Sequence, residues 1–204
     1  RLSSGSCSKE NTWVNLNPVH PDKWLNIRAW FDSKWVKCQP KFSVESNANV
    51  VVTLILSGEM CSICSDGTRN YCKAGELVIL HKRDNQQCMR RSQDSPGKPL
   101  VRLGLVISGS SALYALLKLF SESGDGIIIV RCSEPEVIKK YMLAMKEVIT
   151  CGSGTSFELE NLLFHLLEEA LRQANTGDMP DALRKVMEFI LTHGYKQLTV
   201  TNMV

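Results

Sequence analysis

The sequence has few histidines and no long apolar run. Its four histidines, His20, His81, His165 and His193, stand far apart and are never paired. A divalent metal ion needs several N or O ligands that converge on one point, so we expect neither a metal site nor a cofactor. No apolar segment approaches the roughly 20 residues of a membrane-spanning helix, and no apolar signal segment follows the first residues. We therefore expect a cytoplasmic protein without a membrane partner.

The sequence also lacks a strong charge of one sign. The 204 residues include 24 Lys and Arg against 21 Asp and Glu, which gives a formal net charge of +3. A nucleic-acid-binding domain usually carries a concentrated basic surface. We therefore expect this chain to contact DNA only through a further domain.

Cysteine is abundant, but its spacing is irregular. Three of the eight cysteines lie in "CSICSDGTRNYC", residues 61–72. If Asp66-Gly67 forms a two-residue hairpin turn, Cys61 lies opposite Cys72. Residues three apart on a strand point to opposite faces, which disfavours a zinc site at Cys61 and Cys64. Reduced thiols are the expectation, while a disulfide between Cys61 and Cys72, or a thiol-based sensor, stays open as an alternative.

The first half of the chain has the pattern of short β-strands. Residues 1–20 are polar and predict a flexible N-terminal arm. Apolar and β-branched runs then recur about every ten residues between Gly-containing turns, which favours a sandwich or barrel. The clearest of these runs are 49–58, 60–64, 69–73, 75–80 and 100–108.

The period changes to that of helices after residue 108. A helix is predicted over 110–120, and 126–132 is a short buried strand or an extended link. Possible capping boxes open two longer helices, one from about residue 133 and one over about 156–174. A linker and a further helix follow in 177–204.

The helix over 156–174 has a broad apolar surface. Leu159, Leu163, Leu166 and Ala170 form one stripe, and a second stripe containing Phe164 lies beside it. One helix neighbour does not cover so wide a surface. Both stripes are core residues, or the first stripe meets its copy in a homodimer, and the sequence leaves both possibilities open.

The order of these segments resembles the AraC-type transcription regulators. Residues 50–88 resemble the barrel core of their cupin-like N-terminal domain, in which Ala74-Gly75-Glu76 takes the place of a Pro-Gly-Asp-like turn. The helices from 133 to 174 resemble the family's dimerisation helices. The segment "PDALRKVMEFILTHGYKQLTV" resembles the first helix of its DNA-binding domain.

The resemblance implies an α+β fold, a cupin-like antiparallel β-barrel followed by a helical dimerisation segment. It divides the chain into an arm (1–20), the barrel (21–108), the helical segment (109–176), and the linker with the first helix of a truncated helix-turn-helix domain (177–204).

The function implied is non-enzymatic. The domain would bind a small-molecule effector, such as a sugar or other metabolite, and would couple it to DNA binding by a homodimer. The alternatives are a small cupin enzyme, an isomerase or a dioxygenase, and the thiol-based sensor. The candidate ligand-binding residues are Trp30, Arg69, Tyr71, Cys88, Val101 and Leu103. Of these, Cys88, Val101 and Leu103 are expected to face inward.

Overall fold

The computed structural model describes residues 9–15, 26–35, 50–64, 66–81, 85–90, 98–108, 127–151 and 156–173. These residues form nine strands and two helices: β1 (Lys9–Asn15), β2 (Asn26–Trp35), β3 (Val50–Ser57), β4 (Glu59–Cys64), β5 (Arg69–Lys73), β6 (Glu76–His81), β7 (Asn85–Arg90), β8 (Leu100–Ser108), β9 (Ile127–Arg131), α2 (Pro135–Cys151) and α3 (Ser156–Gln173). The predicted helix over 110–120 and the segment 177–204 lie outside the described residues.

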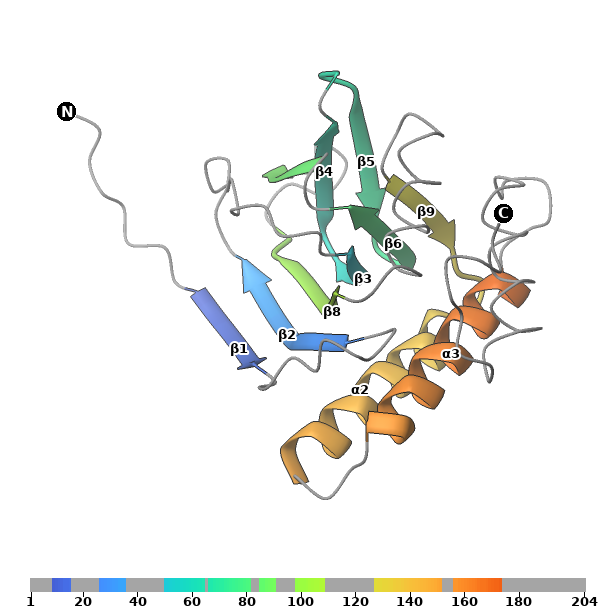
Figure 1. The fold of residues 1–204 in the computed structure, drawn as a ribbon. Coiled ribbons are helices and arrows are strands. Elements are labelled where there is room, and N and C mark those ends of the chain that lie inside the picture. The colour runs from blue at the N-terminus through green and yellow to red at the C-terminus, as the bar shows by residue number, and fades with distance from the viewer. Residues whose placement is uncertain are drawn as a thin grey trace, which may run out of the picture.

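Two antiparallel sheets and a pair of helices make up the described fold (Figure 1). Sheet A has the strand order β1-β2-β8-β3-β6-β9, and sheet B has the order β5-β4-β7. The predicted α+β class is confirmed. The described strands do not close into the continuous barrel that was expected, because sheet A ends at β1 on one side and at β9 on the other.

Sheet A separates two apolar clusters. The helix-facing core lies between sheet A and the helices, and includes Trp30, Val50, Val52, Leu54, Leu77, Ile79, Leu103, Leu105, Ile107, Ile128, Val130, Ile138, Met142, Met145, Leu163, Leu166 and Ala170. The inter-sheet core lies between sheets A and B, and comprises Phe31, Val51, Ile55, Met60, Cys64, Cys72, Val78, Leu80, Leu100, Val106 and Ile127. Alternate residues of β2, β8, β3, β6 and β9 therefore belong to different cores.

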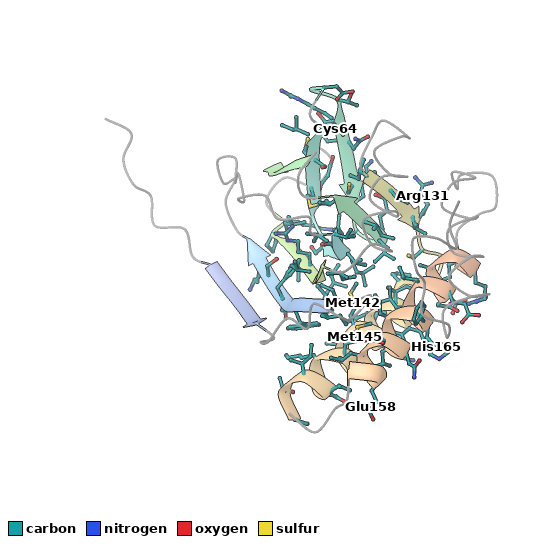
Figure 2. All side chains as sticks on the ribbon, in the orientation of Figure 1. Cys64, Arg131, Met142, Met145, Glu158 and His165 are labelled. Atoms are coloured by element: carbon teal, nitrogen blue, oxygen red, sulfur yellow. The ribbon has the colours of Figure 1, made fainter. Side chains whose placement is uncertain are left out.

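The helices α2 and α3 pack side by side against sheet A (Figure 1). Figure 2 shows Met142 and Met145 on the part of α2 that lies toward the sheet, while Cys64 lies at the distant end of sheet B. Burying an aliphatic side chain stabilises a fold by about 1.5–3 kcal/mol relative to leaving it exposed. The helix-facing core is therefore what holds the helices to the sheet.

Polar contacts at one end of the helix pair complement this core. The Gln173 side chain accepts a hydrogen bond from the Glu134 backbone N at 2.8 Å and donates one to the Glu134 carbonyl at 3.2 Å. Arg172 donates two hydrogen bonds to the Glu169 carboxylate, at 2.8 and 2.6 Å. Hydrogen bonds from Arg172 and Gln173 lower the pKa of Glu169 to about 2. The last turn of α3 is thereby fastened to the start of α2.

The hairpin between β4 and β5 differs from the two-residue turn expected. The Gly67 backbone N donates to the Cys64 carbonyl at 3.0 Å, and the Cys64 N donates to the Thr68 carbonyl at 2.8 Å. Gly67 has a φ of 89°, and the Asp66 carboxylate accepts a 2.7 Å hydrogen bond from the Thr68 N. This is the three-residue type of hairpin, in which the glycine occupies the left-handed region.

The longer turn shifts the cysteine register by one residue. Cys72 lies opposite Met60, and Cys61 lies opposite Tyr71. Met60 and Cys72 belong to the inter-sheet core, so Cys61 points to the other face of sheet B. The predicted pairing of Cys61 with Cys72 is therefore wrong, and a disulfide between them is not favoured by the register.

The turn between β5 and β6 forms where the resemblance placed it. Gly75 has a φ of 87°, its N donates to the Ile55 carbonyl at 2.8 Å, and its carbonyl accepts from the Cys132 N at 3.1 Å. The Glu76 carboxylate accepts a 2.7 Å hydrogen bond from the Lys73 N. The Glu76 side chain therefore stabilises the turn through a hydrogen bond to its backbone.

Two predicted boundaries need correction. Within the predicted arm of residues 1–20, Lys9–Asn15 pairs with β2 as strand β1. An edge strand faces solvent on one side and tolerates a polar sequence, which is why its composition indicated an arm. At the other boundary, Ile127–Arg131 pairs with β6 as strand β9. The sheet domain therefore extends beyond residue 108. No helix in the described part of the chain is long and apolar enough to span a membrane.

Candidate functional site

The predicted ligand residues of β8 face the helices. Leu103 belongs to the helix-facing core, and Val101, two residues earlier on the same strand, shares that side. The expectation that both face the space between the sheets is wrong. Because each side of β8 is covered by another layer, both sets of alternate residues are mainly apolar and the sequence does not show which set points inward. The residues that do face inward include Leu100 and Val106.

Trp30 is fully buried against α2. Its indole Nε1 donates a 3.0 Å hydrogen bond to the Met142 carbonyl. The Lys146 ammonium lies 4.9 Å from the centre of its ring system, within the range of a cation–π interaction. Trp30 thus joins β2 to the middle of α2 and does not face sheet B.

The remaining predicted ligand residues lie on sheet B. Arg69 and Tyr71 are exposed on β5, whereas Cys72, the residue after Tyr71, is buried in the inter-sheet core. Cys88 is on β7, where its backbone lies opposite that of Cys61. The structure does not bring the six predicted ligand residues together, and their ligand role stays a prediction.

The stripe predicted to form a dimer interface packs inside the chain. Leu163, Leu166 and Ala170 are buried in the helix-facing core, and Leu159 is half-buried against it. These side chains are therefore core residues, and a partner copy would reach them only if α3 left the sheet. The dimer prediction for this stripe is corrected accordingly.

Arg102 is a buried charged residue that faces the space between the two sheets. It lies on β8 and is only 7% exposed. Its Nε donates a 2.9 Å hydrogen bond to the Ser33 hydroxyl on β2, and its Nη1 donates to the Met60 sulfur on β4 at 3.5 Å. The guanidinium lies 5.2 Å from the centre of the Phe31 ring. Arg102 therefore connects three strands and both sheets.

Gly104 allows Phe31 to occupy this position. The two residues are directly opposite each other on β8 and β2. A Cβ at residue 104 would overlap with the Phe31 ring. The missing side chain thus lets the ring lie across β8, where it supports the Arg102 guanidinium.

Thr53 supplies a second polar group to the same space. It is fully buried, and it alternates with Val51 and Ile55, which places it on the inter-sheet side of β3. Thr53 pairs with Gly104, and Ile55 pairs with Arg102, so Thr53 is a diagonal neighbour of Arg102. Its hydroxyl oxygen has no hydrogen-bond partner among the described residues. We refer to Arg102, Ser33, Phe31, Met60 and Thr53 as the arginine site.

The buried position also changes the acid–base behaviour of this region. Burial lowers the pKa of Arg102 to about 10, which leaves the guanidinium charged at neutral pH. Burial, together with the negative charge of Glu76, raises the pKa of Cys72 to about 12. Burial also raises the pKa of Cys132 to about 11. A reactive thiol requires a lowered pKa and access to solvent, so Cys72 does not have the properties of a sensor.

The described residues do not gather into a metal centre. No group of three or more His, Cys, Asp or Glu side chains among them is arranged to hold an ion.

Two strand sequences carry a signal for the arginine site. In "LVRLGLVIS" one arginine interrupts an apolar strand, and in "VVVTLILS" one threonine does. Charged residues are rarely buried without specific partners. A polar residue inside a run that predicts a fully buried strand therefore indicates a functional or structural contact.

No protein-family model matches the sequence, and no curated protein matches it either. Solved structures resemble the fold. The AraC-like transcriptional activator CuxR aligns with 100% of this chain and 73% of its own, at 12% identity and a TM-score of 0.49. The cupin domain of an XRE family transcriptional regulator from Enterobacter cloacae aligns with 47% of this chain and 94% of its own, at 12% identity and a TM-score of 0.35.

The protein YhaK from Escherichia coli aligns with 50% of this chain at 16% identity and a TM-score of 0.40, and this chain spans only 45% of YhaK. The structures similar to this chain thus include an AraC-like activator and a cupin-domain regulator.

The close contact at Gly104 predicts that Gly104→Ala destabilises the fold. The added methyl group displaces the Phe31 ring, and overpacking of this kind costs about 1–3 kcal/mol. Urea unfolding measures the loss, and Phe31→Leu in the same background should recover part of it because the residues are coupled. Gly67→Ala is the control for backbone strain: a Cβ there meets nothing within 4 Å, so only a backbone cost of about 1–2 kcal/mol is expected, and Phe31→Leu should recover none of it. Equal stability of Gly104→Ala and the parent chain would contradict the packing described.

The raised pKa of Cys72 predicts that its thiol is protected. A thiol reagent at pH 8 should label the exposed Cys151 in the folded chain and reach Cys72 only after unfolding, as mass spectrometry of the labelled peptides would show. The thiol pKa rises from 9.0 to about 12 on folding. The protonated Cys72 thiol therefore makes its full contribution to the stability of the fold below about pH 9. This contribution is lost as the pH rises toward 12. Cys72→Ala should lose less stability over that interval. Labelling of Cys72 as fast as Cys151 would refute the assignment.

Proposed function

We propose that this chain is the effector-binding and regulatory part of an AraC-type transcription regulator. In this function, a small molecule taken up between the two sheets changes how α2 and α3 are held. The DNA-binding unit would be a further domain, whose first helix the sequence resemblance assigns to residues 177–204. The proposal includes no catalytic step.

The observation that carries the proposal is the position of β2 between the two cores. Trp30 and Phe31 are consecutive, so their side chains point to opposite faces of sheet A. Phe31 contacts the Arg102 guanidinium, and Trp30 donates a hydrogen bond to α2. A displacement of β2 caused by a ligand between the sheets would therefore reach α2 through a single peptide bond.

Contacts between α2 and α3 couple the positions of the two helices. The last turn of α3 is hydrogen-bonded to Glu134, next to the start of α2, and the two helices share the helix-facing core. A ligand shifts the equilibrium between two helix arrangements only as far as it binds one arrangement more tightly. The contacts at Trp30 would supply that difference in affinity.

Effector coupling is tested by a thermal-shift screen of the 204-residue chain with sugars, sugar acids and other small metabolites. At least one compound should raise the melting temperature and change hydrogen exchange in α2. Trp30→Phe removes the hydrogen bond to Met142, and losing such a bond costs about 0.5–1.5 kcal/mol.

The Trp30→Phe chain should still bind the compound, but the change of exchange in α2 should shrink. Thr68→Val is the control, because it removes an exposed hydrogen bond to Asp66 in the β4–β5 hairpin, away from α2. If no compound of any class binds, or if α2 does not respond in the unaltered chain, the proposal is wrong.

A homodimer belongs to the same proposal. Since the first stripe of α3 is in the core, we propose that the contact uses the second stripe, in which Phe164 is half-buried. Phe164→Asp should convert a dimer to a monomer in light scattering at tens of micromolar. Glu168→Ala, on the exposed surface of the same helix, should leave the dimer intact. A monomeric parent chain would remove dimerisation from the proposal.

A further inference from the structure

We propose that the arginine site binds a carboxylate group of the effector, with Arg102 as the charged anchor and Thr53 as the second donor. The ligand class is a small monocarboxylic acid with an apolar body. This inference rests on the function proposed above and specifies the chemistry of its ligand.

The first argument is that the hydrogen bond from Arg102 to Met60 on sheet B has a weak acceptor. Its Nη1 donates to the Met60 sulfur at 3.5 Å, and a thioether is a weak acceptor. A carboxylate oxygen in that position would form a charge-assisted hydrogen bond, and the planar guanidinium suits a two-oxygen acceptor. The Met60 side chain is unbranched and adaptable, so it can move aside.

The second argument is the Thr53 hydroxyl. It is buried without a hydrogen-bond partner among the described residues, and a buried polar group in that condition costs free energy. The strand register makes Thr53 a diagonal neighbour of Arg102 on the same face of sheet A. A carboxylate held by Arg102 would give this hydroxyl an acceptor.

The third argument is the apolar surroundings. The arginine site shares its space with Val51, Val78, Leu80, Leu100 and Val106. A sugar with many hydroxyl groups would leave several of them unpaired here, at a cost in free energy. An acid with an aliphatic or aromatic body would match both the polar anchor and the apolar walls.

Binding would also rearrange the contacts that lead to the helices. Arg102 holds Met60 on sheet B and Ser33 on β2, and its guanidinium lies over Phe31. When a carboxylate replaces Met60, the hydrogen bond across the sheets is exchanged for one to the ligand. The remaining contacts then transfer the change to β2, which carries Trp30.

The experiment uses acids and their neutral amides as matched probes. Benzoate and isovalerate are titrated into the 204-residue chain by calorimetry, beside benzamide and isovaleramide. The acids should bind and the amides should not. Arg102→Gln should weaken acid binding about tenfold or more, because it removes a charged hydrogen bond. Arg131→Gln, a change at an exposed arginine on β9, should have no effect.

Two further variants test the inference even if Arg102→Gln does not fold. Thr53→Val keeps the side-chain shape and should weaken acid binding several-fold, since one hydrogen bond to the ligand is lost. Met60→Leu removes the competing sulfur acceptor and should strengthen acid binding. Unchanged affinity in both variants would overturn the inference.

The outcomes separate this inference from the proposed function. If the amides bind as tightly as the acids, or if only neutral metabolites bind in the wider screen, the carboxylate assignment is wrong while effector binding stands. If no compound of any class binds, the proposed function fails as well.

Discussion

The middle strands of sheet A are buried on both faces, and this constraint shapes the rest of the molecule. One face packs on α2 and α3, and the other packs on sheet B. Every strand in the middle of the sheet must therefore present apolar residues in both directions, as in the burial of β3 from Val50 through Ile55. Burying a polar group in these strands costs free energy unless it is hydrogen-bonded. The buried polar residues of these strands include Ser33, Thr53, Arg102 and Glu76, and all of these except Glu76 belong to the arginine site. Arg102 and Thr53 are two of them, and they are diagonal neighbours.

The arginine site shows how a charge is accommodated in such an interior. The Phe31 ring, the Ser33 hydroxyl and the Met60 sulfur each contact the guanidinium. Gly104 makes this arrangement sterically possible by leaving room for the ring. Since Phe31 and Trp30 are adjacent, the same strand that supports Arg102 also contacts α2. The geometry links the interior to the helices through one short segment of β2.

The role of the cysteines is decided by their burial and not by their spacing in the sequence. The grouping of Cys61, Cys64 and Cys72 indicates a metal or redox site if only spacing is considered. In the fold, Cys64 and Cys72 fill the inter-sheet core, where they act as small apolar side chains. Cys61 points to the other face because it lies three residues from Cys64 on the same strand. Cys72 joins the Cys64 face because the hairpin loop has one residue more than the Asp-Gly pair suggested. A one-residue change in a turn reverses every side chain of the following strand.

The sequence by itself determined several of the local elements. Gly58, Gly75 and the β-branched runs marked β3, β6 and β8, and the capping patterns at Ser133 and Thr155 marked the starts of α2 and α3. These signals are local, because turn chemistry and apolar period depend on neighbouring residues. The α+β order followed from them.

Only the tertiary structure decided which face of each strand points where. Leu103 and Arg102 are adjacent in a strand covered on both sides, so the pattern alone did not show which of them points inward. The pairing of β1, and the assignment of Leu163 and Leu166 to the chain's own core, also depended on distant segments. The physical reason is that burial and strand pairing are properties of contacts between segments far apart in the sequence.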